Sequence, residues 1–171
     1  MNGQVQRPAA KEPLTLLAGP YGHPFHPLVV TVPIGAWVAS MAFDLASRWA
    51  TDPHVFATGS RWLLALGVVG AVVAAMIGVL DLLAIPGGTV ARRTGYLHMS
   101  LNLLVTALYT VSFLLRNGEG PVPWSLVALS VAGLGGLAAA GWLGGELTYR
   151  YGIRVVDETT QAEGFSREER S

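Results

Sequence analysis

Six side chains that could do chemistry stand in or beside the long apolar segments of the sequence: His23, His26, Asp81, His98, Asn102 and Glu146. Neutral imidazole is the commonest metal ligand in proteins. Haem in a helix bundle can be held by one histidine from each side. His26 and His98 lie in different segments, and Asn102 shares a helical face with His98 because it follows four residues later. One hypothesis is therefore a haem b site made by His26 and His98, with Asn102 beside them.

Two other chemistries use the same residues. A non-haem metal ion could be bound by His23, His26 and His98 together with the carboxylate of Asp81 or Glu146. Proton transfer through Asp81, His98 and Glu146 would suit a small proton or ion carrier. A purely structural interpretation competes with all of these, because charged side chains near helix ends commonly reach water. In that case the two acids pair with arginines, namely Arg92, Arg93 or Arg150.

The residues and motifs that are missing narrow the chemistry. The sequence has no cysteine, which excludes disulfides, thiolate-bound iron–sulfur clusters and covalently attached haem. No nucleophile elbow, phosphate-binding loop or zinc-protease helix motif is present. Eleven basic residues balance eleven acidic ones, without the basic stripe that nucleic-acid binding needs. The sequence therefore establishes no enzymatic activity.

The elements that must position these residues are four apolar runs, Pro27–Phe43, Trp62–Leu80, Met99–Leu115 and Val122–Gly145. A helix needs roughly 20 residues to cross a bilayer core, and each run reaches that length with a few flanking residues. Charged residues make up only 13% of the chain, about half the share in soluble proteins. The sequence predicts an all-α integral membrane four-helix bundle with up-down-up-down topology. We expect a flexible tail over residues 1–21, the transmembrane domain over 22–156 and a polar tail over 157–171.

Antiparallel threading places all six candidate residues at one end of this bundle, while Asp44 and Arg61 belong to the opposite end. The candidate end also carries most of the basic residues: Arg7, Lys11, Arg92, Arg93, Arg150, Arg154, Arg167 and Arg170. The other end carries Arg48, Arg61 and Arg116. By the positive-inside rule, we expect a multi-pass protein of a bacterial inner membrane with both termini in the cytoplasm. No cleavable signal peptide is expected, because the apolar stretch at 14–18 is too short.

Small residues recur at a spacing of four in two of the runs: Gly70, Ala74 and Gly78 in the second, and Gly136, Ala140 and Gly144 in the fourth. Such residues let helix backbones approach closely in lipid. They could face the inside of the bundle or a second copy of the chain, so a homo-oligomer stays open.

The string from Gly22 to Gly35, GHPFHPLVVTVPIG, resembles the opening of a bacterial family of four-helix membrane proteins of unknown function. Further similar stretches are Phe43–Leu45, Gly78–Leu82, Gly95–His98 and Gly141–Leu147, so the resemblance spans about Gly22 to Val156. Just after the position of Val30, relatives often have a stretch that bears an aromatic residue or a histidine, where this chain has Thr31 and Val32. A third histidine ligand is therefore absent there.

The resemblance implies a link to membrane redox chemistry, because some relatives are joined to Rieske-type or cytochrome c domains. Such a redox protein would be a separate partner of this chain. The leading hypothesis is thus a membrane redox component with a histidine-based haem or metal site. The alternatives are a cofactor-free structural or regulatory membrane subunit and a small proton or ion carrier.

Overall fold

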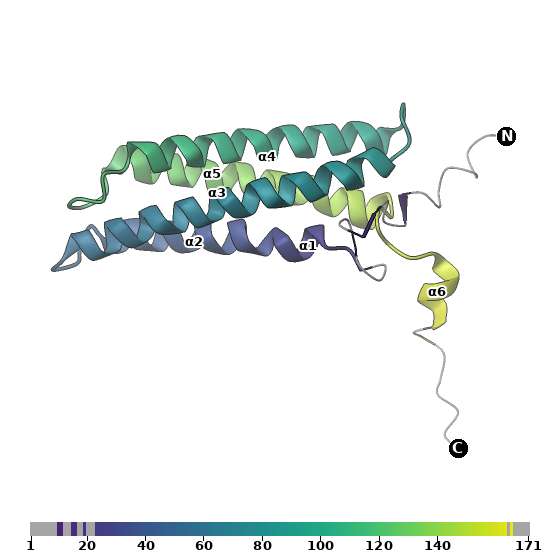
Figure 1. Cartoon of the computed structure of the whole chain (residues 1–171), viewed down its shortest axis with the longest axis horizontal. Coiled ribbons are helices and arrows are strands. Elements are labelled where there is room, and N and C mark those ends of the chain that lie inside the picture. The colour runs from purple at the N-terminus through teal and green to yellow at the C-terminus, as the bar shows by residue number, and fades with distance from the viewer. Residues whose placement is uncertain (1–9, 12–14, 17–18, 20–22, 164, 166–171) are drawn as a thin grey trace, which may run out of the picture.

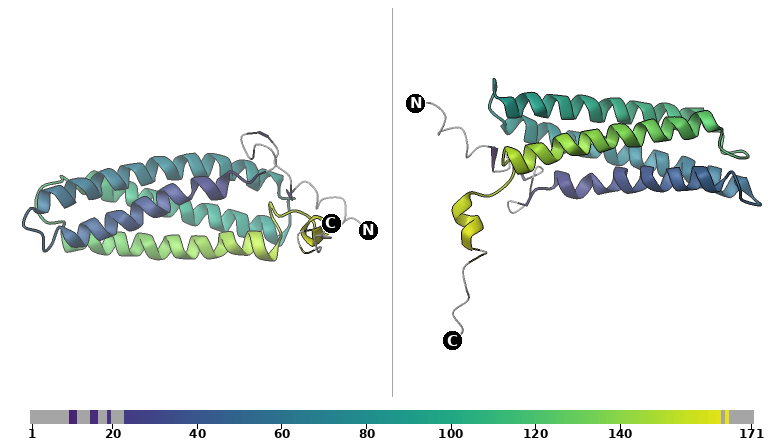
Figure 2. Two further views of the ribbon diagram at one scale, coloured as in Figure 1. Left: turned by 90° about the horizontal axis from the view of Figure 1, so that it is seen from below. Right: turned by 180° about the vertical axis from the view of Figure 1, so that it is seen from behind.

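The computed structural model describes residues 10–11, 15–16, 19, 23–163 and 165 of the chain. The first membrane helix is formed by α1 (His26–Val29) and α2 (Thr31–Ala46), which follow each other almost without a break. Then come α3 (Pro53–Ala84), α4 (Val90–Leu115), α5 (Trp124–Gly145), a π-helical turn η3 (Glu146–Arg150) and a short α6 (Glu158–Glu163). The long helices lie side by side in a bundle, and α6 lies outside it (Figures 1 and 2). The predicted all-α fold is confirmed.

Four helical segments in the described part of the chain are long and apolar enough to cross a membrane: His26–Ala46, Pro53–Ala84, Val90–Leu115 and Trp124–Arg150. Their outer surfaces are apolar, as lipid requires, with exposed residues such as Val69, Met76 and Leu104. Large exposed aromatic side chains lie toward the ends of the segments, as is typical of membrane–water interfaces: Trp49, Trp62 and Trp124 toward one end of the bundle, and Tyr96, Trp142 and Tyr149 toward the other.

Two of the helices, α3 and α4, begin before their apolar runs because capping residues stabilise their N-termini there. Asp52 accepts a hydrogen bond from the backbone N–H of His54, so α3 already begins at Pro53, well before the apolar run that starts at Trp62. Thr89 caps α4 in the same way through the N–H of Arg92. His98, which directly precedes the apolar run Met99–Leu115, therefore lies more than two turns inside α4.

Consecutive helices run in opposite directions (Figure 1). The α2 helix packs against α3 and α5, and α4 packs against the same two helices. No Cα atom of α2 comes within 8 Å of one in α4, so these two helices lie on a diagonal of the bundle. Residues on α2 and α4 meet across the centre only where their side chains are long enough.

Glycines on α3 and α5 provide the space for those side chains. An added Cβ at Gly67 would lie 2.2 Å from Nε1 of Trp37, and one at Gly133 would lie 2.7 Å from the ring of Tyr109. The two rings stack at the centre of the bundle, with centroids 4.2 Å apart. They form one buried cluster with Leu64 and Val105. The inward-facing glycines thus serve packing inside the bundle.

Segments outside the bundle cover the end that carries the candidate residues. Ala10 and Ile153 pack against Leu82 and Ile85 at the end of α3. The backbone N–H of Arg154 donates to the carbonyl of Ala10 at 3.0 Å. Most of the predicted N-terminal tail lies outside the described residues.

The predicted polar C-terminal tail contains α6, which begins after Asp157. The backbone N–H of Thr160 donates to the Asp157 carboxylate at 2.9 Å, which keeps the pKa of Asp157 below its usual range. Asp157 thus acts as a helix cap.

Candidate functional site

The histidine layer, which we define as His26, His98 and Asn102, lies inside the bundle near one end. The rings of His26 and His98 face each other across the diagonal, with centroids 6.5 Å apart and planes 77° apart. His26 comes from α1 and His98 from α4, so the structure brings together two side chains that are 72 residues apart in sequence. The predicted pairing of two histidines from different helices is therefore present in the geometry.

Each ring is held by the neighbouring helix through its Nδ1 atom. His26 Nδ1 lies 3.0 Å from the carbonyl oxygen of Ala74, and His98 Nδ1 lies 2.8 Å from that of Ala140. A carbonyl can only accept, so Nδ1 carries the proton in both neutral rings. Nε2 is then the basic nitrogen on each histidine.

Glycines leave room for both rings. A Cβ added at Gly78 would lie 3.0 Å from Cε1 of His26, and one at Gly144 would lie 3.1 Å from Cε1 of His98. A side chain at either position would therefore press on the imidazole that lies against it.

Asn102 contacts His98 as its spacing predicted. Its Nδ2 lies 3.2 Å from Nε2 of His98 and donates to the backbone carbonyl of His98 at 2.9 Å. The amide therefore lies within contact distance of the basic nitrogen of His98.

The other predicted site residues lie at the same end but have different partners. Asp81 forms an ion pair with Arg154 at 3.1 Å, and Glu146 pairs with Arg150 at 2.6 Å. His23 is exposed. Among residues 23–163 and the few described before them, no three His, Asp or Glu side chains are grouped as metal ligands would be. Arg92 caps the end of α3, where it donates to the carbonyls of Leu82 and Ile85.

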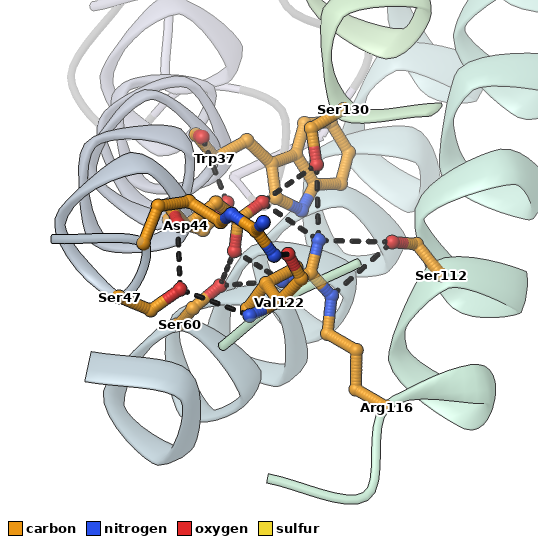
Figure 3. Close-up of polar contacts among 10 residues, drawn as sticks. Trp37, Asp44, Ser47, Ser60, Ser112, Arg116, Val122 and Ser130 are labelled. Carbon is orange, nitrogen blue, oxygen red and sulfur yellow. Dashed lines mark hydrogen bonds and ion pairs between the residues drawn. The ribbon is translucent and has the colours of Figure 1, made fainter. Parts of the chain in front are cut away.

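A second polar cluster, at the opposite end of the bundle, was not recognised from the sequence (Figure 3). Its centre is an ion pair between Asp44 at the end of α2 and Arg116 directly after α4. Both side chains are almost completely buried. The second guanidinium nitrogen of Arg116 lies 2.8 Å from Asp44 Oδ2, which makes the pair bidentate.

Serine hydroxyl groups complete this cluster, which we call the Asp44–Arg116 layer. Ser60 and Ser130 donate to the Asp44 carboxylate at 2.5 Å and 3.0 Å. Arg116 in turn donates to Ser112 and Ser130. Every helix of the bundle contributes a group, so the layer ties all four together. A signal was present in the sequence: an acid ends the first span and an arginine ends the third, on the same side.

The two polar layers are separated by an apolar one. The stacked rings of Trp37 and Tyr109 fill the centre between them, and Leu64 and Val105 close the space around the rings. The Tyr109 hydroxyl donates to the carbonyl of Ser130. Among the described residues, no hydrogen bond joins the histidine layer directly to the Asp44–Arg116 layer.

Comparison with known proteins identifies a family but no characterised relative. The sequence pattern of the DUF2231 family, whose members are described as predicted membrane proteins, matches residues 22–157. No curated protein and no solved structure matches the chain. The match covers most of the sequence, including the histidine layer and the Asp44–Arg116 layer, and it agrees with the resemblance seen in the sequence. The chain belongs to the DUF2231 family of predicted membrane proteins.

Proposed function

We propose that this protein is a membrane redox component that binds haem b between His26 and His98. The proposal rests on the two imidazoles of His26 and His98, which lie close together and are each hydrogen-bonded to a backbone carbonyl. An iron atom held between two imidazoles would separate their ring centres by roughly 6 Å, since each metal–nitrogen bond is about 2 Å and each ring centre lies about 1 Å behind its nitrogen. The two rings are 6.5 Å apart. His26 and His98 would therefore be the residues that hold the haem iron.

The hydrogen bonds of the two rings also suit ligation. Metal-bound histidines usually donate their second ring N–H to a carbonyl or carboxylate, which fixes the tautomer and orients the ring. The carbonyls of Ala74 and Ala140 would do this for His26 and His98 and leave each Nε2 for the iron. Asn102 would then give up its contact with Nε2 and keep its bond to the His98 carbonyl. Haem supplies reversible one-electron transfer when it is bound.

The proposal is tested by the absorbance of the purified protein. Wild-type protein expressed with ample haem should show a Soret band in detergent. His26→Ala or His98→Ala should each abolish the low-spin haem spectrum while the protein still elutes as a folded species. His54→Ala is the matched control, because His54 bonds the carbonyl of Gly118 at the opposite end of the bundle; it should keep the band. Colourless wild-type protein would rule out the haem proposal.

A cofactor-free structural or regulatory subunit is the alternative function. It is favoured by the pairing of the buried charges within the chain, since Asp44 meets Arg116 and Asp81 meets Arg154. Such a protein would be colourless and would act through its surface.

We further propose a bacterial inner membrane location with both termini in the cytoplasm, which the distribution of arginine and lysine supports. The histidine layer would then lie near the cytoplasmic interface. A separate Rieske-type or cytochrome c protein would be a suitable electron-transfer partner.

A further inference from the structure

The axis-facing residues of the bundle occur twice at the same spacing. His26, Trp37 and Asp44 in the first membrane helix each lie 72 residues before His98, Tyr109 and Arg116 in the third. In space, each residue meets its own counterpart: His26 faces His98, Trp37 stacks on Tyr109, and Asp44 pairs with Arg116. Ser40 and Ser112, both fully buried, are a further pair at this separation.

The second and fourth membrane helices repeat as well, at a separation of 66 residues. The repeated positions are small residues: Gly67, Gly70, Ala74 and Gly78 on α3, and Gly133, Gly136, Ala140 and Gly144 on α5.

Their contacts repeat too. Trp37 lies over Gly67 as Tyr109 lies over Gly133. Pro33, together with its neighbour Val32, faces Gly70 as Val105 faces Gly136. His26 is anchored by Ala74 as His98 is by Ala140.

We infer that the chain consists of two equivalent helical hairpins, His26–Ala84 and Val90–Arg150, related by an approximate two-fold axis along the bundle. The inner face of each hairpin is an interaction surface that fits the other hairpin. The Asp44–Arg116 pair makes this association selective for the unlike hairpin. The inference does not depend on haem, although the histidine layer lies on the same axis.

The selectivity follows from the chemistry of the three layers. A histidine can face a histidine, and aromatic rings can stack on their own kind, so these layers would also permit two like hairpins to associate. At the Asp44–Arg116 layer, like hairpins would bury two carboxylates or two guanidinium groups side by side. A buried charge without an opposite partner is strongly destabilising, and such repulsion is how interfaces reject wrong partners.

Exchange of the two charges tests the inference in the intact chain of 171 residues. Asp44→Arg or Arg116→Asp alone should lower the yield of folded protein in detergent more than about tenfold, because each places like charges together. The combination of both changes should recover to within about threefold of wild type, since the serine hydroxyls can donate to a carboxylate or accept from a guanidinium. A combined variant no better than the worse single variant would overturn the inference.

A second exchange keeps the inference testable without altering charge. Trp37→Tyr combined with Tyr109→Trp swaps equivalent positions, each beside its own glycine, and should fold with a yield close to wild type. The control, Trp37→Val combined with Val105→Trp, preserves composition and stays within the same buried cluster but swaps positions that are not equivalent. It should lose folded protein. Equal yields from the two exchanges would contradict the equivalence of the hairpins.

Discussion

At the residue scale, the sequence pointed to one polar layer and not to the other. His26 and His98 stand out because histidines are rare in apolar runs, and antiparallel threading puts them at one level. From the sequence, Asp44 and Arg116 are only separate charges at the opposite end of the bundle, and charges near helix ends commonly reach water. Their pairing depends on how each helix is rotated about its own axis. Runs that are apolar on all faces do not specify this rotation.

The Asp44–Arg116 layer predicts a large effect from one substitution. Arg116→Leu would leave the Asp44 carboxylate buried without its cation, at a cost of about 3–5 kcal/mol. The matched control is Arg61→Leu at the same end, because Arg61 is exposed and rests on the ring of Phe113. Thermal unfolding in mild detergent should show a large drop in melting temperature for the first variant and a small one for the second. Similar melting of both variants would mean that the buried pair contributes little.

At the scale of elements, the number and type of helices could be predicted, but their ends could not. Length and hydropathy are sufficient to identify a membrane-spanning helix. The bounds of α3 and α4 instead depend on Asp52 and Thr89, which cap helices that run beyond the bilayer-length apolar core. The small residues at a spacing of four, which we call the small-residue ladders, are Gly70, Ala74 and Gly78 on α3 and Gly136, Ala140 and Gly144 on α5. The sequence predicts that they pack helices, without a choice between the bundle interior and a second copy. Gly70 and Gly136 face the interior.

The ladders predict which glycines tolerate a side chain. A Cβ at Gly136 would lie 2.7 Å from Cγ2 of Val105, and one at Gly70 would lie 2.9 Å from Cγ1 of Val32. Gly136→Leu and Gly70→Leu should therefore destabilise the bundle by about 1–3 kcal/mol, the usual effect of overpacking. Gly141→Leu is the control, because Gly141 is exposed and has nothing within 4 Å of an added Cβ. Melting temperatures in detergent distinguish these variants, and equal tolerance of all three would show that close packing at the ladders is incidental.

At the scale of the whole molecule, the arrangement in the membrane decides which compartment the histidine layer faces. The chain contains no cysteine, so a single cysteine placed at Pro86, Asn117 or Gln161 reports its own side through an impermeant thiol reagent in intact cells. Pro86 and Gln161 belong to the histidine end, whereas Asn117 follows Arg116 at the opposite end. If lysine and arginine keep the histidine end in the cytoplasm, only the cysteine at position 117 should be labelled. All three should react after the cells are permeabilised, which controls for buried or unreactive thiols. Labelling at 86 and 161 but not at 117 would place the histidine layer at the outer interface, and an electron-transfer partner would then have to approach from that side.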